Sequence, residues 1–507
     1  MNERYSFPSV RRDGLTLILG LGETGVAAAR WCAAQGASLR VLDTRAQPAG
    51  LEALQAAQIA ADLRLGPDAW GGDALAGVHT VVISPGLNPG HAPVSDLLAA
   101  ARGLGVEILG EVELFARALS DLRSQGYAPL LAAVTGTNGK TTVTSLTRHL
   151  AEACGRPVRA AGNIGPAALS SLRDALERDD LPEIWVLELS SFQLESTTSL
   201  APDVAVVLNL TQDHLDWHGS MQAYAAAKAR LLKMARVSVI NRDDAWVRAM
   251  VDDASAGEVR GFGSDAPVFA GDLGLLVRQG LTWLAQAQPA ESEAPSPRAR
   301  RKPADPVRRE PGRVQVLMPA DALQIRGRHN ALNALAALSL GAVLGLPWAP
   351  MLHALREYRG EAHRTELVRT VAGVDFIDDS KGTNVGATLA ALQGQGRPVV
   401  LIAGGLGKGQ DFSPLAPAVR DHARAVLLIG QDGPAIGEAL ADCGVSLESC
   451  QTLGQAVERG MALAQPGDAV MLSPACASMD MFRNYAHRSA CFVAAVRELA
   501  IERGEVA

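Results

Sequence analysis

A strand, a glycine-containing loop and a helix follow one another in the segment that most constrains this chain. The apolar run 130–134 predicts a buried strand, and the residues after 142 have helical periodicity. Backbone N–H groups in such a turn, together with the positive end of the helix, attract phosphate. Val134 stands where the usual P-loop has its first glycine, so the loop is a shortened variant. We predict an ATP site formed by Gly136, Thr137, Asn138, Gly139, Lys140, Thr141 and Thr142.

The composition is that of an ordinary globular protein of several domains. A chain of 507 residues exceeds what one hydrophobic core normally spans, which favours two to four domains. The net charge of −7 gives no general electrostatic reason to bind nucleic acid or an anionic membrane. The six cysteines lack CxxC spacing, so they predict neither a zinc site nor a disulfide framework. No apolar run reaches about 18 residues and no signal peptide is visible, so we expect a cytoplasmic protein without membrane insertion.

Short apolar runs that end in Gly, Asp or Ser alternate with Ala- and Leu-rich segments of helical length. This alternation predicts an α/β protein with parallel sheets, whose ligands lie at the carboxyl ends of the strands. The runs are 15–20, 81–86, 130–136, 185–189, 204–210, 374–380, 399–405, 425–430 and 469–474.

Residues 287–312 differ from the rest of the chain. They are rich in Pro, Ala, Ser and Arg and contain too little apolar surface to form a core. A basic tract of this kind could contact nucleic acid or lipid, but in an acidic protein we interpret it as a disordered, solvated insertion.

The N-terminal segment contains a formal dinucleotide-binding fingerprint, Gly20-Leu21-Gly22-Glu23-Thr24-Gly25, after an apolar strand. Asp43 ends the next strand and could bind a ribose. By itself the motif establishes only a tight turn close to a ligand such as a diphosphate. A redox enzyme also needs a partner for hydride transfer, and no such residue is evident.

Two chemically active side chains follow strands that should flank the phosphate-loop strand. Glu188 and His214 could together bind a Mg²⁺ ion that compensates charge between anionic substrates. Lys228 lies on a helix after the histidine. As an ammonium ion it would be repelled by the metal, so it either points to solvent, the simpler reading from the residues, or is carbamylated by CO₂.

These segments together resemble the ATP-dependent Mur ligases. The resemblance covers nearly the whole chain except the extreme N-terminus and about 265–320. Besides the phosphate loop, it is carried by Gly20–Gly25, Asp43–Arg45, Gly110–Phe115, Glu188–Glu195, Asp213-His214, His329–Asn333, His363-Arg364, Asp379–Lys381 and Ser473–Ser478.

The family resemblance implies three α/β domains. A Rossmann-like domain in residues 1–114 would bind a UDP-linked substrate. A P-loop-type ATPase domain in 115–360 would bind ATP and contain the insertion. A second Rossmann-like domain in 361–507 would bind the incoming amino acid.

The resemblance also implies an ATP-dependent carboxylate–amine ligase of peptidoglycan precursor synthesis. ATP would phosphorylate the carboxylate of UDP-N-acetylmuramoyl-L-alanine, and the amine of D-glutamate would then displace phosphate. The enzyme is expected to be a monomer acting on small molecules only. The alternatives are a related ligase for another amino acid, such as L-glutamate, and an NAD(P)-dependent oxidoreductase that rests on Gly20–Gly25 alone.

The family pattern assigns roles to individual residues. The catalytic residues would be Lys140, Glu188, His214 and Lys228. Two Mg²⁺ ions would be held by Thr141, Glu188, His214 and carbamylated Lys228. The ATP site would further include Asn330, Arg364 and Asp379. The UDP-linked substrate would contact Gly22, Thr24, Asp43, Thr44, Arg45, Ser84, Asn163 and Ser190. Glutamate would contact Lys381, Thr383, Lys408, Ser478 and Tyr485.

Tyr485 departs from the family pattern, which has phenylalanine there. The aromatic surface is kept, but the added hydroxyl needs a hydrogen-bond partner.

Overall fold

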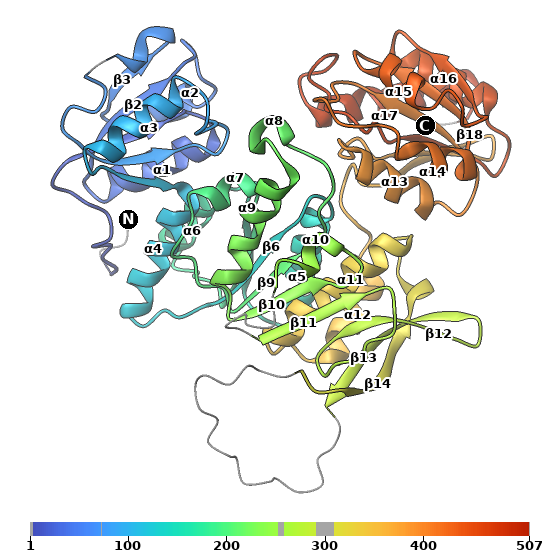
Figure 1. Cartoon of the computed structure of the whole chain (residues 1–507), viewed down its shortest axis with the longest axis horizontal. Coiled ribbons are helices and arrows are strands. Elements are labelled where there is room, and N and C mark those ends of the chain that lie inside the picture. Colours follow the sequence, from blue (N-terminus) through green and yellow to red (C-terminus); the bar gives the residue numbers. More distant parts are fainter. Residues whose placement is uncertain (1–3, 72, 252–257, 290–308, 506–507) are drawn as a thin grey trace, which may run out of the picture.

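The computed structural model describes residues 4–71, 73–251, 258–289 and 309–505. These residues form three sheets, each with its own helices (Figure 1). We call the parts that contain them the N-terminal, central and C-terminal units. The N-terminal and C-terminal units lie on opposite flanks of the central unit (Figure 1). Among the described helices, none is both long enough and apolar enough to cross a membrane.

The N-terminal unit contains a parallel sheet of order β3-β2-β1-β4-β5. The order reverses at β1, so the glycine turn after Leu19 lies at the switch point, where such sheets bind ligands. This confirms the predicted Rossmann-like topology. The strands are β1 (Leu15–Leu19), β2 (Ser38–Asp43), β3 (Asp62–Leu65), β4 (Val78–Ile83) and β5 (Glu107–Gly110), and the helices are α1 (Glu23–Ala34), α2 (Leu51–Ala56), η1 (Pro67–Trp70) and α3 (Val94–Gly103).

The central unit contains a sheet of order β14-β13-β12-β11-β10-β9-β6-β8-β7. Strand β6 (Leu130–Thr135), which precedes the phosphate loop, lies between β8 (Ile184–Glu188) and β9 (Val204–Val207). The other strands are β7 (Val158–Gly162), β10 (Val237–Asn241), β11 (Glu258–Gly263), β12 (Leu273–Arg278), β13 (Leu281–Pro289) and β14 (Gly312–Pro319). The helices are α4 (Glu111–Ser124), α5 (Lys140–Ala153), α6 (Ala168–Arg178), α7 (Ser191–Glu195), α8 (Leu215–His218), α9 (Met221–Met234), α10 (Ala245–Arg248), η2 (Ala320–Ala322), α11 (Arg328–Val343) and α12 (Trp348–Glu357).

The predicted parallel arrangement is incomplete in the central sheet. Strands β12 and β13 form an antiparallel pair connected by the short turn at residues 279–280, and β14 pairs antiparallel with β13. The limits of the predicted disordered insertion are also wrong. Residues 287–289 belong to β13, and residue 312 begins β14, so their backbones are paired. Residues 290–308 lie outside the described part.

At the end of the insertion, Arg309 forms an ion pair with the buried Asp272 and lies over the ring of Phe269 at 4.6 Å. This ion pair compensates the charge of the buried Asp272 carboxylate, which would be destabilising without a partner.

The C-terminal unit contains a sheet of order β15-β16-β20-β17-β18-β19. All neighbouring pairs are parallel except β15 with β16, so an antiparallel edge strand completes a Rossmann-like sheet. The strands are β15 (Glu366–Val371), β16 (Val374–Asp378), β17 (Val399–Gly404), β18 (Ala423–Ile429), β19 (Ser446–Ser449) and β20 (Ala469–Leu472). The helices are α13 (Val385–Gly394), α14 (Leu415–His422), α15 (Gly433–Ala439), α16 (Leu453–Leu463) and α17 (Tyr485–Glu502).

The units are joined in physically different ways. One hydrophobic core contains Trp31 of the N-terminal unit, Phe115 of α4 and Trp185 of β8, so the first two units share buried apolar surface. Among the residues that the structure describes, the cores of the C-terminal unit contain none from the central unit. Apolar burial therefore fixes the first interface, whereas the second has no shared core.

Two glutamates in the first turn of α4 bond that helix to the rest of the central unit. Their pKa values are shifted in opposite directions. Glu111 Oε1 accepts the N–H of Leu169 at 2.6 Å, but its buried Oε2 has no partner among the described residues. Burial raises the pKa of Glu111 to about 7. Glu113 accepts the N–H groups of Thr198 and Ser199 and an ion pair from Arg117. Burial opposes ionisation of Glu113, but these bonds outweigh it and lower its pKa.

We predict opposite stability effects for Glu111→Gln and Glu113→Gln. The folded pKa of Glu111 lies above its usual 4.5, so ionisation opposes folding as pH rises from about 4.5 to about 7. Above that range the cost levels off at about 3 kcal/mol, and Glu111→Gln removes it. Thermal unfolding at pH 8 should therefore show a higher midpoint for Glu111→Gln and a lower one for Glu113→Gln. The advantage of Glu111→Gln should shrink at pH 5.5, and an equal advantage at both pH values would contradict this assignment.

Candidate active site between the three units

The phosphate loop is held by one asparagine that follows β9. Asn209 accepts the N–H of Thr137 on its carbonyl at 2.9 Å and that of Asn138 on Oδ1 at 2.8 Å. Its Nδ2 donates to the carbonyl of Asn138 at 3.0 Å. The N–H groups of residues 139–142 have no acceptor among the described residues, as expected at a helix start. The backbone N–H groups available to an anion are therefore those of residues 139–142, because those of Thr137 and Asn138 are bonded to Asn209.

Close packing requires a glycine at the beginning of this loop. Gly136 has a φ of +151°, and a Cβ on it would lie 2.9 Å from Cβ of Leu208. A side chain there would push the loop away from β9.

The lysine of the loop lies against the backbone in this structure. Lys140 Nζ donates to the carbonyls of Gly136 at 3.0 Å and Thr137 at 2.9 Å. Burial lowers the pKa of Lys140, while the nearby Glu188 carboxylate opposes this effect. The ammonium group is therefore held close to the free N–H groups of residues 139–142.

Glu188 and Asn163 meet at the carboxyl end of β8. Glu188 is 2% exposed, and its Oε1 accepts the amide of Asn163 at 2.8 Å. Its Oε2 is buried and has no hydrogen-bond partner among the described residues. A buried carboxylate oxygen without a partner is costly unless a cation binds it. The donor set therefore fits a divalent metal.

Lys228 does not point to solvent, so that part of the sequence-based interpretation is wrong. The side chain is 1% exposed, and Nζ donates to the carbonyl of Gly136 at 2.9 Å. It also lies over the ring of Tyr224 at 4.7 Å. The sequence showed a lysine on a helix but not which face of α9 packs against the loop. Burial and the charge of Lys140 hold the pKa of Lys228 well below its usual range.

His214 lies at the start of α8 with a left-handed φ of 53°. Its ring packs edge-on against Phe192, with the centroids 4.8 Å apart. Burial lowers the pKa of His214, which favours the neutral imidazole that metals bind.

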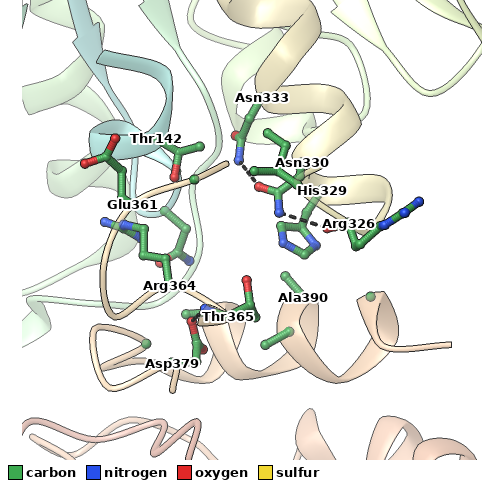
Figure 2. Close-up of a pocket in the computed structure, with 18 of the residues that line it drawn as sticks. Thr142, Arg326, His329, Asn330, Asn333, Glu361, Arg364, Thr365, Asp379 and Ala390 are labelled. Carbon is green, nitrogen blue, oxygen red and sulfur yellow. Dashed lines mark hydrogen bonds between the residues drawn. The ribbon is translucent and has the colours of Figure 1, made fainter. Parts of the chain in front are cut away.

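A cleft with a volume of about 1060 Å³ separates the central and C-terminal units. Figure 2 shows Asn330 and His329 on the central side, facing Ala390 of α13. Asn330 is fixed by Nδ2, which donates to the carbonyl of Arg326 at 2.8 Å. The cleft brings together six of the predicted ATP-site residues: Asn138, Gly139, Thr142, Asn330, Arg364 and Asp379.

Asp379 lies on the C-terminal wall of this cleft (Figure 2). It accepts the Ser473 hydroxyl at 2.6 Å and the N–H of Thr365 at 3.1 Å. Burial raises the pKa of Asp379 to about 7.

Two cations of the C-terminal unit reach the phosphate loop. Arg364 Nη2 and Lys381 Nζ donate to the hydroxyl of Thr141 at 3.0 and 3.3 Å. Burial, followed by the charge of Arg364, lowers the pKa of Lys381 to about 8. These contacts join the predicted nucleotide and amino-acid sites directly.

The other predicted amino-acid ligands occupy neighbouring loops of the C-terminal unit. Tyr485 is 37% exposed and begins α17, with its ring centroid 5.4 Å from Nζ of Lys381. The Tyr485 hydroxyl has no hydrogen-bond partner among the described residues, so the partner that we expected for it is not supplied by this part of the chain. Lys408 is exposed with a φ of 55°, Ser478 is buried, and Thr383 is half-buried next to Lys381.

The predicted contacts of the UDP-linked substrate lie around the first glycine turn and across the unit boundary. Gly22 caps α1, Thr24 lies in its first turn, and Ser84 donates to the carbonyl of Gly20 at 2.9 Å. A Cβ on Gly165 would lie 3.3 Å from Glu23, so the loop after Asn163 lies close to α1. Thr44 and Arg45 are exposed, Asp43 is buried, and Ser190 caps α7 through a bond with Gln193.

Several residues of the site were not identified from the sequence. Asn209 and Tyr224 belong to segments that were noted, but their roles depend on tertiary contacts. Arg488 is buried and links two loops by donating to the carbonyls of Ser380 at 2.8 Å and Cys476 at 3.1 Å. Its place in the long helix α17 gave no signal.

His363, Glu366 and Asp378 place potential metal-ligand atoms within 4.8 Å of one another. His363 Nδ1 is already bonded to Asp378 at 2.9 Å, and the Ser489 hydroxyl bonds the same carboxylate at 2.6 Å. The group is therefore a hydrogen-bonded cluster in this structure.

Three family models match separate parts of the chain. They are the Mur ligase MurD-like N-terminal domain at residues 15–110, the Mur ligase middle domain at 134–275 and the Mur ligase glutamate ligase domain at 363–476.

Curated relatives match almost the full length. The UDP-N-acetylmuramoylalanine–D-glutamate ligase of Bordetella parapertussis is 62% identical over 97% of this chain and 98% of its own. The protein of the same name from Paraburkholderia xenovorans is 54% identical over 97% of this chain and 98% of its own.

Solved structures share the fold at low identity. MurC of Thermotoga maritima has a TM-score of 0.55 at 19% identity, covering 96% of this chain and 99% of its own. MurF of Thermotoga maritima, solved in complex with ADP, has a TM-score of 0.56 at 16% identity, covering 92% and 96%.

We predict that Asn209→Ala loosens the phosphate loop without unfolding the chain. The variant removes two side-chain hydrogen bonds to Asn138, so local opening should become easier by about tenfold or more. Hydrogen exchange of peptides covering residues 135–141 should accelerate accordingly. Asn163→Ala is the matched control, because that side chain bonds Glu188 rather than the loop. Unchanged exchange in Asn209→Ala would contradict the assignment.

Proposed function

The chain belongs to the Mur ligase family, and from that premise we propose that it joins D-glutamate to UDP-N-acetylmuramoyl-L-alanine while ATP is converted to ADP and phosphate. The observation that carries the proposal is the approach of Arg364 and Lys381 to the Thr141 hydroxyl. Two cations of the C-terminal unit, which we propose binds the amino acid, are thus within hydrogen-bonding distance of the phosphate loop. The choice of substrate is supported by two UDP-N-acetylmuramoylalanine–D-glutamate ligases that are 62% and 54% identical to this chain over 97% of its length.

In the proposed reaction, a carboxylate oxygen of the L-alanyl group attacks the γ-phosphorus of ATP. The bond from phosphorus to the ADP oxygen breaks, giving an acyl phosphate and ADP. The amine of D-glutamate then attacks the acyl carbon, loses a proton, and phosphate leaves as the amide forms. Both reactants are anions, so closely placed positive groups must offset their repulsion. Lys140, Arg364 and Lys381 supply that charge from two units.

The proposed nucleotide position follows the cleft. The free N–H groups of residues 139–142 would bind phosphate oxygens, and Asn330 would contact the base. Asp379 would accept a ribose hydroxyl, for which a carboxylate is a suitable acceptor. Arg364 would contact the phosphates.

We also propose that two Mg²⁺ ions are held by Thr141, Glu188, His214 and the carbamate of Lys228. Bound there, magnesium would offset negative charge on the phosphates and the carboxylate. The unpartnered Oε2 of Glu188 and the lowered pKa of His214 support this donor set. Asn163 would hold Glu188 in place through its amide.

The remaining assignments keep the predicted domain limits of 1–114, 115–360 and 361–507. We propose that the enzyme acts as a monomer in the cytoplasm, where ATP is supplied. The UDP-linked substrate would be bound by Gly22, Thr24, Asp43, Thr44, Arg45, Ser84, Asn163 and Ser190. D-glutamate would be bound by Lys381, Thr383, Lys408, Ser478 and Tyr485.

Phosphate release from ATP tests the proposed function. Purified chain with Mg²⁺ and UDP-N-acetylmuramoyl-L-alanine is given D-glutamate, L-glutamate or diaminopimelate. Release should depend on D-glutamate and be stoichiometric with the amide product detected by mass spectrometry. Equal turnover with L-glutamate would identify the related ligase instead. No release with any amino acid would contradict ligase activity.

We predict that Lys228 reacts with CO₂. Burial increases the fraction of neutral amine, whose nitrogen attacks CO₂, forming an N–C bond and releasing a proton. With ¹³C-labelled bicarbonate, wild-type protein should show a carbamate carbonyl signal in the ¹³C NMR spectrum. The signal should be lost in Lys228→Ala and kept in Lys233→Ala, which alters an exposed lysine of the same helix. A signal that persists in Lys228→Ala would disprove the assignment.

A further inference from the structure

The C-terminal unit touches the phosphate loop through an asparagine with no predicted role. Asn384 is 4% exposed and caps α13 by accepting the N–H of Ala387 on Oδ1 at 2.9 Å. The same side chain crosses to the central unit and forms a reciprocal amide pair with Asn138. Asn138 Nδ2 donates at 3.1 Å, and Asn384 Nδ2 donates back at 3.0 Å.

The orientation of this amide is determined by its surroundings. The N–H of Ala387 requires an acceptor, so Oδ1 must face the helix. The carboxylate of Asp213 is 3.3 Å from the other end of the amide and requires a donor, so Nδ2 must face it. Only an asparagine supplies both groups at this length. Aspartate would cap the helix equally well but would lack the donor to Asn138 and Asp213.

Helix α13 is also shaped for close approach to the central unit. A Cβ on Gly386 would lie 2.7 Å from the Thr211 hydroxyl, and one on Gly394 would lie 2.9 Å from the ring of His329. The first and last turns of α13 thus pack against the central unit without space for side chains. Figure 2 shows the same helix forming the wall of the cleft opposite His329.

We propose that Asn384 is a positioning residue that locks the amino-acid loop onto the phosphate loop when the C-terminal unit closes. Thr383, proposed to bind glutamate, directly precedes it in the chain, and Lys381 lies three residues before it. Asn138 lies in the loop proposed to bind ATP. The amide pair therefore sets the distance between the two reactants, and the inference rests on the proposed function.

The pair differs from the cationic contacts between these units, and Asn384 is buried, whereas the bond from the N–H of Asp411 to Gln212 Oε1 at 3.1 Å is exposed. Arg364 and Lys381 bond the Thr141 hydroxyl, but all three groups are proposed to serve substrates or metal and would exchange partners on binding. The side chain of Asn384 bonds no proposed metal ligand. Asn138 is the one residue of a proposed substrate site that it contacts. Because the units share no apolar core, one polar pair contributes substantially to the closed arrangement.

Asn384→Asp tests the proposal, because it keeps the cap but replaces the donor with a carboxylate that faces Asp213. Small-angle X-ray scattering of the full chain, with and without the ATP analogue AMP-PNP, should show a larger radius of gyration than wild type in at least one condition. The KM for both D-glutamate and ATP should rise by about tenfold, while the KM for the UDP-linked substrate stays unchanged.

Asn484→Asp is the matched control. Asn484 caps α17 by accepting the N–H of His487 at 2.9 Å, and it makes no hydrogen bond to the described residues of the central unit. The control should scatter like wild type. Asn138→Asp, which alters the pair from the other side, should scatter like Asn384→Asp.

The inference is overturned if wild type and Asn384→Asp scatter alike in both conditions, or if scattering changes while the KM for D-glutamate does not. An increase of KM without a change in scattering overturns it as well, because the residue would then act only within its own loop. Failure of the proposed function is seen separately, as absence of phosphate release by the wild type.

Discussion

The accumulation of positive charge around one loop is the constraint on which the site depends. Lys140, Arg364 and Lys381 lie close together, and burial lowers the pKa of both lysines. Such an arrangement is unfavourable in the isolated protein and becomes favourable when anions bind, because the charges are already in position. Glu188 is the carboxylate that both lysines share as an electrostatic partner. A site for two anionic reactants follows from this charge distribution before any substrate is named.

The two interfaces of the central unit follow from the same requirement. The N-terminal unit shares an apolar core with it across α4, which fixes the N-terminal unit relative to the phosphate loop. The C-terminal unit brings two of the three cations and is joined by hydrogen bonds and ionic groups without a common core. Polar contacts can be exchanged for contacts with substrates at little net cost, whereas an apolar interface cannot. The interface of the N-terminal unit with the central unit is therefore the more rigid one, and the interface of the C-terminal unit is the more adjustable one.

Much of the fold could be predicted because strands and glycine turns leave local signals. The runs at 130–136 and 399–405 became β6 and β17, and the phosphate loop appeared where predicted. The antiparallel strands β13 and β14 were missed because a Pro- and Arg-rich composition hid their ends. Lys228 was misplaced because the direction of a helical side chain depends on tertiary packing. Asn209, Asn384 and Arg488 gave no signal, since their partners lie far away in the chain.

The N-terminal fingerprint Gly20–Gly25 predicts the backbone turn correctly, but it does not by itself predict a nicotinamide dinucleotide as the ligand. The glycines make the expected tight turn after β1, but Asp43 faces inward. It accepts the N–H of Leu21 at 2.7 Å and pairs with Arg45 at 2.7 Å. Burial opposes its ionisation, but these bonds outweigh it and hold its pKa at about 2. Each oxygen of Asp43 already accepts two hydrogen bonds, so at the proposed UDP site this carboxylate would hold Arg45 and the turn in place rather than accept a ribose hydroxyl. The exposed Arg45 lies beside the turn, where we propose that the diphosphate of the UDP-linked substrate binds.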